Sequence, residues 1–383
     1  MLLEYKNKKE KEEIIKSAKS YNSLDMCLKK NYLIYGENLK ALSMMLKKYK
    51  GKIDLIYIDP PYNSNQVFTV TSTRSNTVSK AINGKIAYSD NFSKEEYVEF
   101  IRERLIVLRE LLSEQGSIYL HIDDKMGHYI KIIMDEVFGF ENFKNDISRV
   151  KSNPKNFGRR AYGNQKDTIL FYSKNHKKNI FNDITEPLTN DEIVSRFKKV
   201  DKSGRRYTTV PVHAPGETIN GVTGQKWKGM YPPKGRHWRY PPDRLTELDN
   251  LNLIEWSKTG NPRIKNFADE NKGKKVQDIW VFKDPTRPKY PTEKNNEMLD
   301  FIVRQSSNID SIILDCFVGS GTILSIAEKL DRIFIGIDES EIAIKSCIEN
   351  LSDANYVFID LEQNVFETKE AKIKQTKLPI LMS

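Results

Sequence analysis

The chain has 383 residues, 38% of them hydrophobic and 30% charged, and its formal net charge is +10. This composition excludes a disordered chain, and the length is sufficient for one large α/β domain with a second, smaller one. No run approaches ~18 uninterrupted apolar residues and no apolar leader segment is present, which argues against a membrane span. The three cysteines are scattered, which argues against a metal centre and a disulfide framework. We therefore expect a cytoplasmic protein.

The first 91 residues predict two strands with a helix between them. Residues 1–30 are rich in Lys and Glu and predict a peripheral helix or arm. Strands are expected within 31–38 and at 53–58, where apolar residues cluster, and the residues between them have a helical pattern. Ser, Thr and Asn dominate 64–91. We expect this segment to be a long loop, and such loops in compact domains are often functional.

A clear helix follows the loop. Ser93 and Glu96 have the spacing of a capping box, apolar residues recur at helical intervals, and Gly116 is expected to end the helix. Further elements are then predicted in the order strand, helix, strand, at 117–122, 126–138 and 167–173. Alternation of strands and helices is typical of a parallel sheet covered on both faces.

The alternation lapses in a basic middle segment and then resumes. From Lys144 to Arg239 there are 21 Lys and Arg against 8 Asp and Glu. This concentration favours a nucleic-acid partner, with a basic surface that has no ligand as the alternative. Residues 175–280 lack long helical periodicity and predict a separate or inserted domain. Helices are again expected at 297–307 and 322–330, and strands at 311–315 and 332–338.

A carboxylate, two prolines and an aromatic residue follow the strand at 53–58, in the order Asp59-Pro60-Pro61-Tyr62-Asn63. The exocyclic amine of a base is a poor nucleophile, and it improves when two acceptors hold its hydrogens. Asp59 and the carbonyl of Pro60 suit that task, because prolines stiffen the turn. Tyr62 offers a ring on which an extruded base can stack, and Asn63 offers a polar contact. The alternative is a rigid surface turn with an incidental carboxylate.

A glycine-containing turn, DCFVGSGT, begins at the end of the predicted strand 311–315. Gly319 and Gly321 let the backbone approach a ligand closely at the carboxyl end of a sheet. Asp338, at the end of the next strand, is placed to accept hydrogen bonds from ribose hydroxyls. Without a third glycine or a following Lys-Ser/Thr pair, the turn favours a nucleoside that lacks a pyrophosphate. A tight turn in some other α/β fold is the alternative.

Together, these two stretches resemble the amino-group DNA methyltransferases of permuted order (the beta class), in which the catalytic motif precedes the cofactor loop. The resemblance extends from about residue 31 to residue 350 and includes RLIVLRELLSEQGSIYLHIDD, YPTEKNNEML and RIFIGIDES. The chain is also similar to modification subunits of restriction systems. The resemblance implies a Rossmann-like α/β fold with a mainly parallel sheet, S-adenosylmethionine as methyl donor, and a flipped base in double-stranded DNA as acceptor.

The resemblance assigns roles to segments and residues. The segments are an N-terminal arm (1–30), the catalytic half of the methyltransferase domain (31–174), a basic target-recognition domain (175–280) and the cofactor-binding half (281–383). The catalytic residues are Asp59, Pro60, Pro61, Tyr62 and Asn63. The cofactor-binding residues are Glu37, Asn38, Asp59, Thr292, Lys294, Asp315, Phe317, Gly319, Gly321, Thr322, Asp338 and Glu339. Among them, Asp338 is expected at the ribose, Thr292 and Lys294 at the methionine carboxylate, and Glu37 near the adenine.

Several alternatives remain within this interpretation. A motif that begins with Asp favours N6 of adenine in this family, and N4 of cytosine is the alternative. A non-catalytic DNA-binding paralogue would have no need of both intact motifs. Similar enzymes that act on RNA or on a protein glutamine amide commonly begin the motif with Asn and not with Asp. For Trp227 and Trp238, contact with DNA and packing in a core are equally supported interpretations. Relatives in this order are often dimers, so a homodimer is expected, and a cognate restriction endonuclease is a candidate partner.

Overall fold

The computed structural model describes residues 2–61, 67–70, 85–89, 92–153, 160–285, 294–363 and 365–370, and of 67–70 and 85–89 it gives the backbone alone. The chain divides into two compact units. Unit 1 consists of Met1–Asp183 and Gln277–Ser383, and unit 2 consists of Ile184–Val276, which lies within the 175–280 segment. None of the helices in these described ranges has the length and hydrophobicity needed to cross a membrane.

Unit 1 is an α/β structure. Its helices are α1 (Lys11–Lys19), α2 (Asn38–Tyr49), α3 (Lys94–Leu111), α4 (Gly127–Phe138), η1 (Phe140–Asn142), α7 (Asn296–Ser306), α8 (Thr322–Lys329) and α9 (Glu341–Asn350). Its strands are β1 (Tyr32–Tyr35), β2 (Ile53–Ile58), β3 (Val67–Val70), β4 (Lys85–Ser89), β5 (Leu112–Ile122), β6 (Phe143–Val150), β7 (Lys166–Ser173), β16 (Ile279–Trp280), β17 (Ile312–Asp315), β18 (Ile333–Asp338), β19 (Tyr356–Asp360) and β20 (Val365–Lys369).

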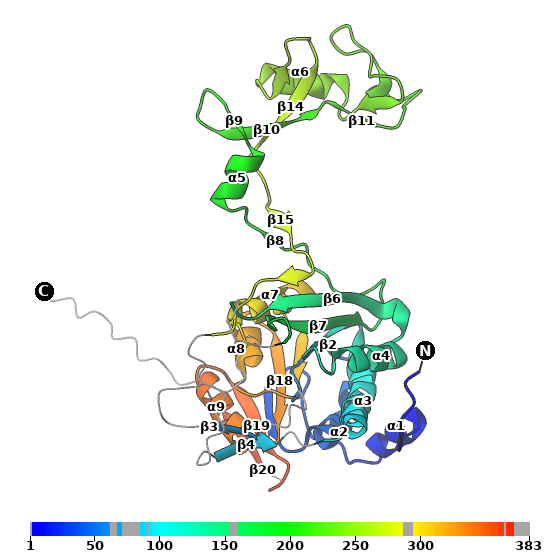
Figure 1. The fold of residues 1–383 in the computed structure, drawn as a ribbon, viewed down its shortest axis with the longest axis vertical. Coiled ribbons are helices and arrows are strands. Elements are labelled where there is room, and N and C mark those ends of the chain that lie inside the picture. Colours follow the sequence, from blue (N-terminus) through cyan, green and yellow to red (C-terminus); the bar gives the residue numbers. More distant parts are fainter. Residues whose placement is uncertain are drawn as a thin grey trace, which may run out of the picture. The chain divides into compact units, whose positions relative to one another are not determined.

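A large sheet forms the middle layer of unit 1, with the strand order β16-β6-β7-β5-β2-β17-β18-β1-β19-β20. Among the described strands, the central run from β5 to β19 is parallel throughout, and β7 and β20 pair antiparallel with their neighbours. Helices α1 to α4 lie on one side of the sheet and α7 to α9 on the other (Figure 1). The α/β fold with a mainly parallel sheet is therefore confirmed.

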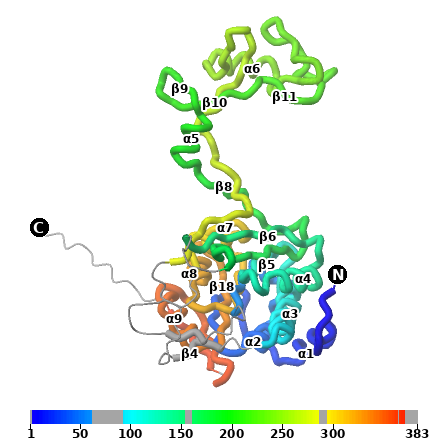
Figure 2. The backbone as a smooth tube through the Cα atoms, viewed as in Figure 1, coloured from blue at the N-terminus to red at the C-terminus, as the bar shows by residue number. Residues whose placement is uncertain are grey.

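Segments from the two ends of the chain share this sheet. The backbone trace shows blue N-terminal and orange C-terminal segments within the same unit (Figure 2). In detail, β2 pairs with β17 in a register that puts Leu55 opposite Ile313 and Ile56 opposite Leu314. The central strands are apolar on both faces, as expected for strands covered by helices on both sides.

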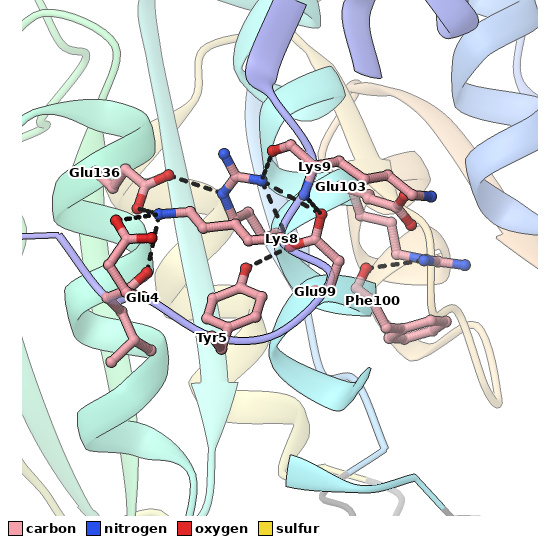
Figure 3. Close-up of polar contacts among 11 residues, drawn as sticks. Glu4, Tyr5, Lys8, Lys9, Glu99, Phe100, Glu103 and Glu136 are labelled. Carbon is pink, nitrogen blue, oxygen red and sulfur yellow. Dashed lines mark hydrogen bonds and ion pairs between the residues drawn. The ribbon is translucent and has the colours of Figure 1, made fainter. Parts of the chain in front are cut away.

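The N-terminal residues pack onto α3 and α4. Ile14 and Ala18 of α1 are buried in the main core. Ahead of this helix, Figure 3 shows Tyr5 directed at Glu99 and Lys8 directed at Glu136, and the Lys8 Nζ lies 2.9 Å from the Glu136 carboxylate. The predicted arm thus includes a helix that belongs to the core.

Two expectations about unit 1 were wrong. The long helix α3 ends at Leu111 and not at Gly116, because Leu112 is already extended and buried as the first residue of β5. Gly116 is needed inside that strand, where a Cβ would lie 2.8 Å from the Ile53 carbonyl oxygen. Residues 64–91 are not wholly loop, since β3 and β4 form an antiparallel pair there.

Unit 2 is a small mixed structure built around tryptophans. Its helices are α5 (Asn190–Arg196), η2 (Val222–Gly224) and α6 (Pro242–Asn250), and its strands are β8 (Thr185–Glu186), β9 (Lys199–Val200), β10 (Arg206–Pro211), β11 (His213–Pro215), β12 (Arg236–Trp238), β13 (Ile254–Trp256), β14 (Pro262–Phe267) and β15 (Lys274–Lys275). Strands β13, β14, β10 and β9 form one sheet, and β11 pairs with β12.

The core of unit 2 decides between the two roles considered for its tryptophans. Trp227 and Trp238 are 2% and 3% exposed and meet edge to face, and Trp256 stacks on Trp227. The indole N–H of Trp227 donates to Thr246 and that of Trp238 donates to the Gln225 carbonyl, so both polar atoms are satisfied internally. Both residues are therefore packing residues, and of the two alternatives the structure supports core packing.

Candidate active site

The carboxyl ends of neighbouring parallel strands bring the two sequence motifs together. Asp59 follows β2 directly, and Asp315 is the last residue of β17, the strand paired with β2. Asp338 ends β18, whose Gly336 pairs with Asp315. Because the strands are parallel, all three carboxylates lie at one edge of the sheet, where ligands of open α/β sheets bind.

A cavity of about 460 Å³ opens at this edge. The predicted site residues that line it are Asn38, Asp59, Pro61, Lys294, Asp315, Phe317, Gly319, Thr322, Asp338 and Glu339. Lining residues that the sequence did not single out are Tyr57, Phe92, Phe100, Leu299, Cys316, Val318, Ser320, Ile323 and Ser340.

The remaining predicted residues lie elsewhere. Pro60 is buried beside the cavity wall, and Gly321 forms the turn into α8 without belonging to the lining. Glu37 is the N-cap of α2, where its carboxylate accepts from the Leu39 and Lys40 amides, and it also stays outside the lining. Tyr62, Asn63 and Thr292 lie outside the described residues.

The glycine turn is held by hydrogen bonds to the two flanking aspartates. The Phe317 amide donates to Asp315 Oδ1 at 2.9 Å. The Gly319 and Ser340 amides donate to the two carboxylate oxygens of Asp338, each at 2.9 Å. Gly321 has φ +76°, a conformation that side chains rarely adopt, and it precedes the first residue of α8. These bonds shape a tight loop whose backbone borders the cavity.

The carboxyls of the cavity differ in environment. Asp59 lies 2.7 Å from the Lys294 ammonium, and both side chains are largely buried. Burial raises the pKa of Asp338 to about 6, against the lowering effect of the Ser340 and Gly319 amides, and raises the pKa of Asp315 well above its usual range. A cationic ligand group in the cavity would favour the ionised forms of both, since opposite charge stabilises a carboxylate.

Arg104 is a site residue that the sequence did not reveal. It is 5% exposed, and its Nε donates to Asn38 Oδ1 at 2.6 Å while its Nη2 donates to Glu37 Oε1 at 2.6 Å. Asn38 in turn donates to the Cys316 carbonyl at 2.8 Å, in the first turn of the glycine loop. The guanidinium also stacks 3.4 Å above the ring of Phe100, which lines the cavity. Arg104 thus links α3 to the glycine loop through Asn38, and it stacks on an aromatic residue of the cavity wall.

A second series of buried, hydrogen-bonded polar groups begins at Tyr57 in the cavity wall and leads away from the cavity. Its hydroxyl lies 3.0 Å from His121 Nδ1, and His121 Nε2 lies 3.3 Å from Asp167 Oδ2. Burial, followed by the charge of Lys294, lowers the pKa of His121. A neutral His121 that donates to Asp167 can accept from Tyr57, so this histidine fixes the strand that carries Asp59.

This fold and this site define an α/β enzyme that binds a ligand at the carboxyl ends of its strands, and comparison with known proteins identifies the class. A family model described as DNA methylase matches residues 53–349, so the chain belongs to the DNA methylase family. That family includes enzymes acting on adenine N6 and enzymes acting on cytosine N4.

Individual relatives agree with the family. The type II methyltransferase M.EcaI of Enterobacter cloacae is 38% identical over 359 residues, covering 92% of this chain and 75% of that protein. The probable type III restriction-modification enzyme HindVI Mod subunit of Haemophilus influenzae is 32% identical, but the match covers 49% of this chain and only 23% of that protein. Among solved structures, the M1.HpyAVI–SAM complex is similar at 17% identity and a TM-score of 0.42, covering 84% of this chain and 100% of that one.

Proposed function

We propose that the protein transfers a methyl group from S-adenosylmethionine to N6 of adenine in double-stranded DNA, at a short recognition sequence and with the base flipped out. The observation that carries the proposal is the pairing of β2 with β17, which puts Asp59, Pro61 and the loop residues from Asp315 to Ser320 around one cavity. The motif that begins at Asp59 suits the acceptor amine, and the glycine loop suits the nucleoside part of the methyl donor. Methyl transfer needs donor and acceptor side by side.

The cavity fits S-adenosylmethionine, which supplies an electrophilic methyl group on a sulfonium when bound. The aromatic rings of Phe100 and Phe317 suit an adenine, and Asp338 suits the hydroxyls of a ribose. At the other end, Lys294 suits the carboxylate of the methionine part, and its present partner is Asp59. The raised pKa of Asp315 and Asp338 is consistent with carboxyls that ionise when a cation enters.

Asp59 and the Pro60 carbonyl would hold the two hydrogens of the acceptor amine. This draws the nitrogen lone pair out of conjugation with the ring and aims it at the methyl group. Pro60 has no N–H and a fixed φ, so its carbonyl keeps its direction. Catalysis then consists of positioning and hydrogen bonding, without a covalent intermediate, and Asp59 is the first acceptor for the proton that the product amine releases.

The motif Asp-Pro-Pro-Tyr supports adenine over cytosine as the acceptor, since the resemblance associates an initial Asp with adenine N6. Cytosine N4 is the second candidate, because the family includes both activities. Incubation of the purified protein with plasmid DNA and methyl-labelled S-adenosylmethionine, followed by hydrolysis to nucleosides, separates them. We expect label in N6-methyladenine; label in N4-methylcytosine would replace the adenine assignment, and unlabelled DNA would contradict the methyltransferase proposal itself.

We further propose that unit 2 belongs to the target-recognition domain and that the protein works as the modification enzyme of a restriction–modification system in the cytoplasm. Unit 2 itself contains 18 Lys and Arg against 11 Asp and Glu, and this excess supports a DNA-binding role for it. The names of relatives, a type II methyltransferase and a type III Mod subunit, support the biological setting. A homodimer and a cognate restriction endonuclease stay predictions from the sequence.

Replacement of Arg104 by alanine should weaken the binding of S-adenosylmethionine by about tenfold, because Asn38 loses the donor that orients it toward the Cys316 carbonyl. The matched control is Arg102→Ala. Arg102 is also buried on α3, but it pairs with Glu136 at 2.8 Å on the side of the N-terminal arm. Each change should lower the free energy of unfolding by about 1–3 kcal/mol, since each removes a buried guanidinium and leaves its hydrogen-bond partners unsatisfied.

Isothermal titration with S-adenosylmethionine and denaturant unfolding of both variants measure the two effects separately. The assigned role requires that only Arg104→Ala changes the affinity for the cofactor. Equal cofactor affinity in the two variants would reduce Arg104 to a stabilising core residue.

A further inference from the structure

The cations of unit 2 fall into two groups, those paired with carboxylates and those that are not. Among the described residues, ion pairs of the unit include Lys199–Glu255, Arg205–Asp269, Arg205–Glu270, Lys228–Asp249, Arg244–Glu247, Lys274–Glu186 and Lys274–Glu192. Paired cations at a surface are largely neutralised and attract a polyanion weakly. Cations without such pairs are therefore the informative ones.

Three arginines of the second group lie near His213 in β11. The Arg239 amide donates to the Val212 carbonyl, next to His213, and Arg263 pairs with Pro211. Arg236 lies on the partner strand β12, and its Nη1 is 3.2 Å from His213 Nδ1. The charges of Arg236, Arg239 and Arg263 all lower the pKa of His213, after the larger effect of burial. Neutral His213 adds no charge of its own, and within the described ranges no carboxylate comes within 4.0 Å of the three guanidiniums.

Two of these guanidiniums are held by the end of β10. Arg239 Nε donates to the Pro211 carbonyl at 2.9 Å. Arg263 Nε donates to Thr209 Oγ1 at 2.9 Å, and its Nη2 donates to the Thr209 carbonyl at 2.8 Å. A guanidinium carries five N–H donors, so each retains donors beyond those that fix it to the strand. Side chains already held in place lose less conformational entropy when they bind a further partner.

We infer that Arg236, Arg239 and Arg263 form a phosphate-binding cluster on unit 2 that grips the backbone of double-stranded DNA. The inference rests on the proposed function, which supplies DNA as the substrate, and it assigns the grip to one edge of the unit formed by β11, β12 and β14. Planar forked donors in an uncompensated cluster match the oxygens of phosphodiesters, which occur at regular spacing along a duplex. The cluster sets affinity and register, and sequence is read by other residues.

The test is the salt dependence of DNA binding by the full chain. Arg236 and Arg239 are both exposed, so the double variant Arg236→Gln/Arg239→Gln should fold normally. With a duplex of arbitrary sequence, we expect a less steep plot of log affinity against log salt, by about 0.9 for each phosphate that the variant no longer neutralises, and at least about a tenfold weaker affinity near 0.1 M salt. Arg244→Gln is the matched control, an exposed arginine of the same unit paired with Glu247, and it should change neither quantity appreciably.

A charge-preserving variant separates phosphate contact from base recognition. Arg236→Lys/Arg239→Lys should retain most of the salt slope, because an ammonium also binds phosphate, whereas a bidentate contact to guanine needs the guanidinium fork. The lysine variant could keep the salt slope and yet lose affinity for some base sequences more than for others. That result would overturn the inference and show that these arginines read bases. An equal loss in Arg244→Gln would overturn it in favour of unspecific charge.

Two further arms close the test. Inorganic phosphate alone should bind the protein far more weakly than the duplex does; phosphate that binds as tightly as the duplex would assign the cluster to free phosphate and overturn the DNA assignment. Methyl transfer by the unaltered protein is measured in parallel. If the unaltered protein is active and the glutamine variant keeps the full salt slope, only the inference about the arginine cluster is contradicted. If the unaltered protein transfers no methyl group, the proposed function is contradicted. The DNA-binding curves test the arginine cluster in both cases.

Discussion

We expect the Asp59→Ala variant to bind S-adenosylmethionine within about threefold of the unaltered protein and to transfer the methyl group at least about 10³-fold more slowly. The carboxylate stands after β2, at the cavity edge where the acceptor amine would be held. Its loss removes the hydrogen-bond acceptor that acts most strongly as the nitrogen becomes tetrahedral, and also the first acceptor for the released proton. Asp59→Asn should be nearly as slow, because an amide carries no charge and presents donors to the amine.

The matched control is Asp54→Asn, near the start of β2, whose other end leads into Asp59. Asp54 accepts from Ser113 and from the Ile312 amide, and it has no place in the cavity. This change should lower the free energy of unfolding by about 1–3 kcal/mol and leave the turnover of the folded enzyme unchanged. Single-turnover transfer to DNA, with cofactor binding measured separately, gives both quantities. Turnover of Asp59→Ala close to that of the unaltered protein would remove Asp59 from the chemistry.

The sequence alone was sufficient to predict that the two motifs meet at the carboxyl ends of the central strands. Asp59 and Asp315 are 256 residues apart in the chain, yet each ends an apolar run with the pattern of a buried strand. Parallel strands with helical connections end at the same edge, so the two motifs were expected to meet, and the pairing of β2 with β17 brings them together. Local patterns suffice here because the topology follows from them.

Other features depend on contacts between distant residues and leave no local signal. Arg104 stands in a helical segment where an arginine normally faces solvent, and its burial becomes visible only with Glu37 and Asn38, 67 and 66 residues away. Tyr57 had the pattern of a core strand residue, and its polar contact with His121 is equally long-range. The strand β6 was missed because its sequence, FKNDISRV, has little apolar alternation and is specified by pairing with β7.

Composition left the role of two tryptophans in the middle of the chain open for a related reason. Tryptophans in a basic segment suit DNA contact as well as core packing, and a small unit needs large side chains to fill a core of its own. Trp227 and Trp238 serve that need, together with Val212, Leu245 and Ile264. The residues left for DNA are then the exposed cations, which is why their pairing with carboxylates is more informative than their number.

Replacement of Gly321 by alanine should lower both stability and cofactor affinity, for two separable reasons. The first is backbone strain, because φ is +76°. The second is overlap, because the new Cβ would lie 2.3 Å from the sulfur of Cys347, a fully buried residue of α9. Strain of about 1 kcal/mol and overpacking of about 1–3 kcal/mol together predict a loss of about 2–4 kcal/mol in the free energy of unfolding. The loop must shift to relieve the overlap, so affinity for S-adenosylmethionine should fall by at least about tenfold.

Two further variants separate these causes. Gly51→Ala has a similar φ of +68° with no atom within 4 Å of the new Cβ, so it should show the strain alone and leave cofactor binding intact. Cys347→Ala removes the sulfur that collides, so the double variant Gly321→Ala/Cys347→Ala should recover stability relative to the sum of the single changes, by about 1–2 kcal/mol in a double-mutant cycle. Additive single changes, or a Gly321→Ala variant no worse than Gly51→Ala, would show that the loop does not depend on its close packing against α9. A positive coupling would mean that the shape of the cofactor loop is set by a side chain 26 residues further along the chain, which neither glycine motif nor strand pattern could have indicated.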